Sequence, residues 1–141
     1  MQDMNEAEIR SFLTDTIRTG KLATVRADGR PHVAPIWFAL DGNDLLFTTW
    51  HTSVKAKNMQ HDPRVSLCVD DESPPFAFVI IEGTVEITED ADDLLQWATR
   101  IGGKYMGQDQ AEAFGKRNGV EGELLVRLTP TKIIATKDLA A

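Results

Sequence analysis

The sequence predicts a mainly β protein with helical insertions, an α+β barrel that is closed or half-closed. Three observations support this prediction. Six or seven short apolar runs have the composition of strands, and turn signals separate them at short spacing. Segments with helical periodicity interrupt these runs. Gly83 lies within the longest run, where a bulge or a sharp bend at a barrel corner favours a glycine.

The N-terminal third is predicted to form one helix and three strands. Asn5 and Glu8 have the spacing of a capping box, and the apolar residues that follow keep helical spacing until Gly20. Asp28-Gly29 and residues 41–43 are turn signals between apolar runs. The expected elements are a helix over residues 6–18 and strands over residues 22–27, 32–40 and 45–50.

The middle of the chain is predicted to contain a short helix and two further strands. Ser53 has the residue type of an N-cap, and Pro63 stops the helix near His61. A polar loop with two prolines, residues 71–75, separates the next two apolar runs. The expected elements are a helix that ends near residue 61 and strands over residues 64–70 and 77–87.

The C-terminal third is predicted to form two helices followed by two strands. The acidic residues 89–93 suit a helix N-terminus, because negative charge there interacts favourably with the helix dipole. Asn118-Gly119 marks the end of the second helix, and Thr129-Pro130 is expected to form a hinge between the last strands. The expected elements are helices over residues 91–105 and 110–117 and strands over residues 123–128 and 132–136.

Composition and charge limit the classes of function. The 141 residues fit one domain, residues 1–141, and the formal net charge of -7 argues against nucleic acid or an anionic membrane as the main partner. No apolar run approaches the roughly 18 residues of a membrane helix. The polar N-terminus is not a signal peptide, and the single cysteine, Cys68, forms no internal disulfide, so we expect a cytoplasmic protein. Because His32, His51 and His61 are widely spaced, no metal site is predicted.

The segment of residues 52–59 stands out from this acidic background. Ser53 precedes a predicted helix start, and Lys55, Lys57 and Asn58 follow it directly. Free backbone N–H groups, the positive end of the helix dipole and lysine charges together make a phosphate site. Because the two lysines are two residues apart, both reach one phosphate only if Lys55 lies at the junction of loop and helix. The alternative is an ordinary solvated helix face.

Six segments of the chain together carry a resemblance to a known family, namely residues 20–25, 28–38, 46–49, 55–58, 61–67 and 82–85. On these segments the chain resembles the pyridoxamine-phosphate-oxidase-like split β-barrel superfamily, the FMN-binding split barrels. The resemblance covers about residues 6 to 137, and residues 29–67 are specific to the superfamily. Within it, the sequence is most similar to the small deazaflavin-dependent oxidoreductases of the B type, which bind coenzyme F420.

This resemblance implies a homodimer with two cofactor sites at the subunit interface. By position, Lys55, Lys57 and Asn58 would hold the cofactor phosphate, and Ser53 would add a hydroxyl and a backbone N–H. The residues expected beside the tricyclic ring are Pro35, Ile36, Trp37, Thr48 and Thr49, and His32 is expected near the ring or the tail. A groove for the acidic oligoglutamate tail of the deazaflavin is expected to use Lys21, Arg26 and Arg30.

The resemblance implies a redox enzyme in which the cofactor carries the chemistry. Reduced deazaflavin would give a hydride to an electron-poor double bond of a small conjugated substrate, while the protein supplies orientation and excludes water. The sequence identifies no catalytic acid. One alternative is an FMN-dependent flavin reductase or oxidase-like enzyme of the same fold, and another is a binder of F420 or haem without turnover. Trp37 is expected either in the core or as a wall of the ring site.

Overall fold

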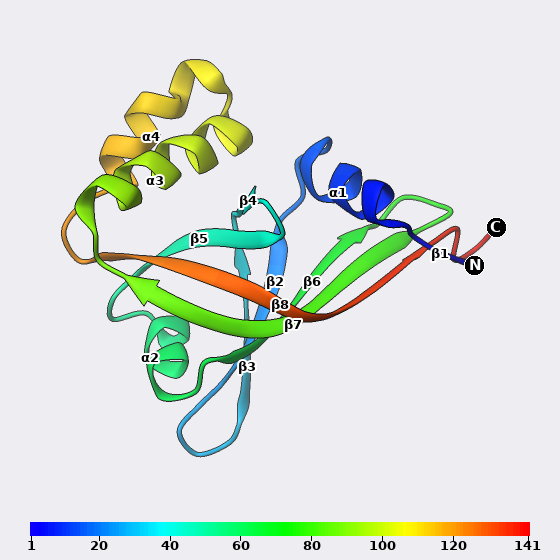
Figure 1. Cartoon of the computed structure of the whole chain (residues 1–141), viewed down its shortest axis with the longest axis horizontal. Coiled ribbons are helices and arrows are strands. Elements are labelled where there is room, and N and C mark those ends of the chain that lie inside the picture. Colours follow the sequence, from blue (N-terminus) through cyan, green and yellow to red (C-terminus); the bar gives the residue numbers. More distant parts are fainter.

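The computed structural model describes residues 1–141 and contains one sheet of eight strands (Figure 1). All strand pairs are antiparallel, and the order of neighbours is β3-β2-β6-β7-β8-β5-β4, with β1 paired to β8 beside this path. The strands are β1 Gln2–Asp3, β2 Gly20–Val25, β3 Pro31–Ile36, β4 Ala39–Asp41, β5 Asp44–Trp50, β6 Arg64–Asp71, β7 Ala77–Thr88 and β8 Glu123–Lys137. This is an α+β split barrel, as the sequence predicted.

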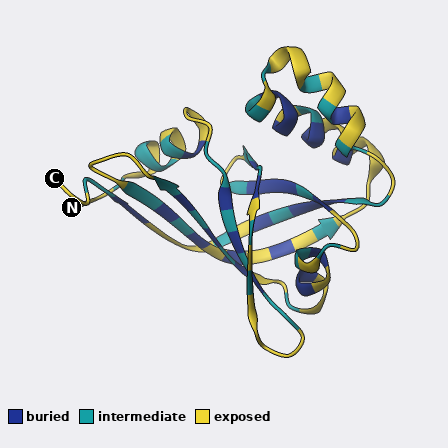
Figure 2. Ribbon diagram, turned by 180° about the vertical axis from the view of Figure 1, so that it is seen from behind, coloured by how far each residue is buried: buried dark blue, intermediate teal, exposed yellow.

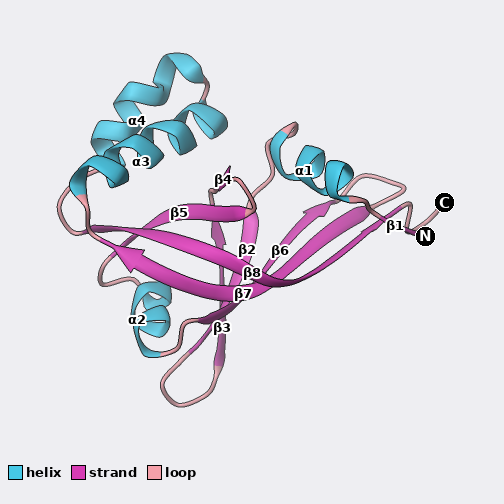
Figure 3. Cartoon of the chain, in the orientation of Figure 1, coloured by secondary structure: helices cyan, strands magenta, loops and turns pink.

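The two edge strands of the sheet, β3 and β4, are consecutive in the chain. Only Trp37 and Phe38 lie between them, so the sheet curls until its two edges meet at this connection (Figure 3). The prediction of one strand over residues 32–40 was therefore wrong. β3 pairs with β2 whereas β4 pairs with β5. The chain therefore leaves the β2–β3 pair at Ile36 before it enters the β4–β5 pair at Ala39.

Four α-helices and one short 3-10 helix complete the fold. They are α1 Glu6–Thr14, α2 Val54–His61, α3 Ala91–Met106, η1 Gln108–Gln110 and α4 Ala111–Asn118. The predicted capping box at Asn5 and Glu8 is present, but α1 ends at Thr14 rather than at residue 18. Ser11 donates its hydroxyl hydrogen to the Asp15 carboxylate and Thr14 donates to the Arg10 carbonyl, and such local bonds compete with further helix. None of the helices has both the length and the apolar composition needed to cross a membrane.

Gly83 marks the irregularity that the sequence predicted. The β7–β8 register shifts between Glu82 and Gly83, because Gly83 faces Pro130 whereas Glu82 faces Lys132. Thr131 is therefore an extra residue in β8, next to a proline that has no N–H to give to the ladder. A Cβ at Gly83 would collide with the carbonyl oxygen of Thr129. The last two predicted strands are one bulged strand rather than two strands joined by a hinge.

The core lies inside the curled sheet, where inward-facing residues of the strands are fully buried (Figure 2). Burial alternates along β2 and β6, as expected for strands that cover a core with one face. The largest fully buried side chains of this cluster are Phe38, Phe47, Leu22, Leu45, Leu67 and Leu128. A smaller cluster of Leu46, Leu94, Trp97 and Leu125 attaches α3 to β5 and β8. The helical hairpin of α3 and α4 therefore rests on the outside of the barrel, beside the connection between β3 and β4.

Candidate functional site

A pocket of about 410 Å3 lies between the barrel and the α3–α4 hairpin. Its wall combines the end of β3, the middle of β5, the first turn of α2 and the underside of α3. The lining residues are Thr19, Pro35, Ile36, Trp37, Thr48, Lys55, Ala98, Ile101, Asn118 and Glu123. Five of the ten predicted site residues thus meet in one pocket, namely Pro35, Ile36, Trp37, Thr48 and Lys55. We call this the candidate pocket.

The turn between β5 and α2 places Lys55 in the candidate pocket. Ser53 is the N-cap of α2, and its Oγ accepts a hydrogen bond from the Ala56 N–H at 3.2 Å. The hydroxyls of Ser53 and Thr49 lie 2.7 Å apart in a further hydrogen bond. Thr49 is 3 % exposed, whereas its neighbour Thr48 faces the pocket, as alternation along a strand requires. The hydrogen bonds of Ser53 and Thr49 therefore fix the start of α2.

Lys55 and Lys57 point into different pockets of this chain. Lys57 lines a second, smaller pocket of about 290 Å3 together with Arg26, Arg30 and Asn58. This separation follows from their positions on α2, because residues two apart do not share a helix face. Neither lysine side chain makes a hydrogen bond or an ion pair within the protein. Both charges are available to a ligand, but a single phosphate in the candidate pocket meets only Lys55.

Asn58 and His32 are turned toward the protein rather than toward the pocket. Asn58 is 6 % exposed, and its Nδ2 donates to Thr24 Oγ1 at 3.0 Å. This bond ties α2 to β2. His32 on β3 stands opposite Thr24 in the strand register, and its Nδ1 is buried without a hydrogen-bond partner. The side-chain amide of Asn58 is thus occupied by a bond that holds α2 in place.

Trp37 joins the candidate pocket to the helical hairpin. Its ring stacks on Tyr105 of α3 with centroids 5.0 Å apart and planes within 2°, and Phe114 of α4 lies 6.0 Å away. The Tyr105 hydroxyl donates to the Arg18 carbonyl at 2.7 Å and accepts from the Phe38 N–H at 3.2 Å. Burial raises the pKa of Tyr105 to about 12. Trp37 is therefore half-buried: it packs against the helical hairpin and also lines the candidate pocket.

Lys104 is a second attachment point of the hairpin, and the sequence reasoning missed it. Its Nζ donates to the carbonyl of Leu13 at 3.1 Å and to that of Phe38 at 3.0 Å. The same ammonium lies 3.9 Å from the centre of the Phe38 ring. Burial lowers the pKa of Lys104 to about 8. The available signal was its position three residues after Ile101, on the buried side of α3.

Glu123 is the other functional candidate that the sequence reasoning missed. It is the first residue of β8, opposite Trp50, and its half-buried carboxyl faces the candidate pocket. Burial raises the pKa of Glu123, while a hydrogen bond with Thr48 and the charge of Lys55 act in the opposite direction. A glutamate at the start of an apolar strand gave no signal, because its partners come from β5 and α2.

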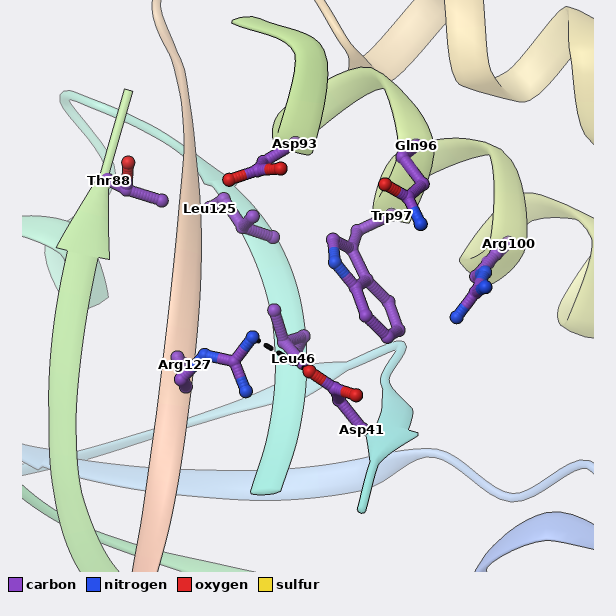
Figure 4. A pocket seen from close by; sticks show the side chains of 9 residues that line it. All are labelled: Asp41, Leu46, Thr88, Asp93, Gln96, Trp97, Arg100, Leu125 and Arg127. Atoms are coloured by element: carbon purple, nitrogen blue, oxygen red, sulfur yellow. Dashed lines mark hydrogen bonds and ion pairs between the residues drawn. The ribbon is translucent and has the colours of Figure 1, made fainter. Parts of the chain in front are cut away.

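A different pocket, of about 370 Å3, lies on the opposite flank of α3 (Figure 4). Arg127 extends across it, and its guanidinium donates to Asp41 at 2.9 Å and to Asp44 at 3.0 Å. Arg100 stacks over the Trp97 ring at 4.7 Å. Because Arg127 is already paired with two carboxylates, its charge is less available to an anion than the charge of the free Lys55.

The chain belongs to the family described as pyridoxamine 5'-phosphate oxidase, whose sequence pattern matches residues 6–137. Among solved structures, the conserved hypothetical protein Rv2991 from Mycobacterium tuberculosis is 28% identical with a TM-score of 0.84, covering 98% of this chain and 89% of that one. A protein named F420 reductase is 28% identical with a TM-score of 0.68, covering 87% and 94%. The heme storage protein HutZ from Vibrio cholerae, 21% identical with a TM-score of 0.75 and covering 96% and 98%, shares the fold.

Proposed function

We propose that this protein is an oxidoreductase that uses coenzyme F420, and that the candidate pocket holds the phosphate and the ring of that cofactor. The observation that carries the proposal is the unpaired Lys55 in the first turn of a capped helix, inside a pocket walled by Trp37. Backbone N–H groups and the helix dipole add to the lysine charge. The 28% identity to a protein named F420 reductase supports this cofactor among those that split barrels bind.

In this proposal, the residues of the pocket have different roles. Lys55 and the N-terminal N–H groups of α2, including the turn at Ser53, hold the phosphate. Pro35, Ile36 and Trp37 lie along the ring together with Thr48, and they keep water from it. Thr49 and Asn58 keep α2 in position, and His32 stays a candidate near the ring or the tail. When bound, reduced F420 supplies a hydride to an activated double bond of a small conjugated substrate.

The smaller pocket at Lys57 fits the acidic tail of the cofactor better than the phosphate. Of the three cations expected there from the sequence, Lys21 pairs with Asp70 at 2.9 Å and Arg30 with Asp28 at 2.8 Å. Arg26 instead donates to the carbonyl of Pro31, which leaves its charge without a carboxylate partner. We therefore assign the tail to Arg26 and Lys57, whose side chains line one pocket.

A second copy of the chain would complete the site in this proposal. The edge strand β3, which borders the candidate pocket, exposes 65% of Val33, and Trp50 at the end of β5 is 45% exposed. Exposed apolar groups beside a site suit a partner surface. Light scattering of the purified protein should give twice the mass of one chain, and the mass of a single chain at micromolar concentration would remove this part of the proposal.

A fluorescence titration of the purified protein with F420 and with FMN tests the proposal. We expect tight binding of F420 and weak binding of FMN, and we expect Lys55→Ala to weaken F420 binding by about 1–3 kcal/mol, the range of a charge-assisted hydrogen bond. Lys116→Ala is the matched control, because this exposed lysine on α4 pairs only with Glu112. Tight FMN binding with weak F420 binding would support the alternative, a flavin reductase or oxidase-like enzyme with the same phosphate site.

A further inference from the structure

The candidate pocket contains one cation and one carboxylate. Lys55 and Glu123 both line it, and no other charged residue does. They come from α2 and β8 and form no ion pair with each other. Burial raises the pKa of the Glu123 carboxyl, and the charge of Lys55 acts in the opposite direction. A carboxylate beside a phosphate site is unfavourable for binding an anion, so its presence needs an explanation.

The other groups around Glu123 do not neutralise it. Thr48 of β5 contributes a neutral hydroxyl, and the α3 and α4 residues of the pocket, Ala98, Ile101 and Asn118, carry no charge. On its far side, Glu123 borders a pocket that also contains His51 and two further carboxylates, Glu89 and Glu121. The His51 ring is held by a hydrogen bond between its Nδ1 and the carbonyl of Gly122 at 2.9 Å. Lys55 is therefore the main counter-charge of Glu123.

A neighbouring carboxylate discriminates between ligands by the amount of negative charge that they bring. A phosphodiester carries one negative charge at neutral pH, whereas a phosphomonoester carries about 1.5 to 2 because its second pKa lies near 6. Repulsion from Glu123 increases with that charge, while Lys55 attracts both kinds of phosphate. The two residues together favour a monoanionic phosphate over a dianionic one.

We propose that Glu123 is a specificity-determining residue of the candidate pocket, which selects a cofactor with a phosphodiester over one with a terminal phosphomonoester. This inference rests on the proposed function. Coenzyme F420 joins its ring system to the tail through a phosphodiester, whereas FMN ends in a phosphomonoester. Riboflavin has the ring of FMN and no phosphate, so it reports on the ring site alone.

The test compares binding of F420, FMN and riboflavin to the wild-type protein and to Glu123→Gln by fluorescence titration at pH 7.5. We expect the glutamine variant to gain roughly tenfold in the affinity for FMN relative to F420, the effect of about one unit charge near a partly solvated site. Its riboflavin affinity should not change. Glu123→Asp keeps the charge and should keep the wild-type preference, and Glu121→Gln, an exposed neighbour, should behave as wild type.

The outcomes separate this inference from the proposed function. Circular dichroism should first show that Glu123→Gln and Lys55→Ala are folded. If the affinity for FMN relative to F420 is then unchanged in Glu123→Gln, the role of Glu123 is overturned, even if Lys55→Ala loses cofactor. An equal gain for riboflavin also overturns it, because the effect would not come from phosphate charge. If wild type and Glu123→Gln bind neither F420 nor FMN, both the proposed function and the inference fail.

Discussion

Replacement of Lys104 by methionine tests how the helical hairpin is attached to the barrel. The change removes two hydrogen bonds, to the carbonyls of Leu13 and Phe38, and the contact of the ammonium with the Phe38 ring. It also removes the cost of holding a charge in a half-buried position. Each hydrogen bond to a charged group contributes about 1.5–3 kcal/mol before that cost is subtracted. We expect Lys104→Met to lower the free energy of unfolding by about 1–3 kcal/mol at pH 7.

The size of this effect should depend on pH in a defined direction. Burial lowers the pKa of Lys104 from 10.5 to about 8 in the folded protein. Between these two values the unfolded chain keeps a proton that the folded chain has lost, so the wild-type stability rises with pH relative to a variant without the amine. The difference of about 2.5 between the two pKa values, at about 1.4 kcal/mol per pKa unit, gives an upper bound of about 3.5 kcal/mol, and solvent screening of this half-buried group reduces it to roughly 1–2 kcal/mol.

Urea unfolding followed by tryptophan fluorescence measures the prediction at pH 7.0 and pH 9.5. The difference in unfolding free energy between wild type and Lys104→Met should be larger at the higher pH. The Tyr105 hydroxyl, with a pKa of about 12, stays protonated throughout this range. Lys116→Met, at an exposed lysine of α4, provides the control and should show no such change. A difference that shrinks or stays constant between the two pH values would refute the reasoning.

Two further substitutions test the parts of the fold that support the site. Asn58→Ala should lower the unfolding free energy by about 1–3 kcal/mol even without cofactor, because it leaves the buried Thr24 hydroxyl unpaired, and thermal unfolding of the cofactor-free protein that matches wild type would contradict a structural role. Gly83→Ala should cost more than about 2 kcal/mol, since its Cβ meets the Thr129 carbonyl at the bulge, and an unchanged denaturation midpoint would show that β8 shifts freely there.

The sequence was most informative where local chemistry decides the structure. The capping box at Asn5, the N-cap at Ser53 and the bulge at Gly83 are all present, because each depends on residues close in the chain or on a glycine that packing demands.

Features that depend on distant partners were not predictable. Residues 37 and 38 read as strand, and only the pairing of β3 and β4 with different neighbours shows that the chain must break there. The position of Lys104 on the buried side of α3 indicates burial but not its partners, which lie 66 to 91 residues away in the chain. Glu123 gave no signal, because its partners lie on β5 and α2. The separation of Lys55 and Lys57 into two pockets follows instead from local helix geometry, which the spacing of the two lysines already indicated.

The helical hairpin leaves and rejoins the sheet at nearly the same point. β7 ends at Thr88, which pairs with Leu125 near the start of β8, so residues 89–122 form an excursion from an otherwise continuous ladder. No residue of this segment takes part in the strand pairs of the sheet. One wall of the candidate pocket can therefore be exchanged as a unit, by recombination or by grafting, while the proposed phosphate site on β5 and α2 is inherited intact. A scaffold organised in this way can acquire new substrates without having to rebuild the site proposed here for the cofactor.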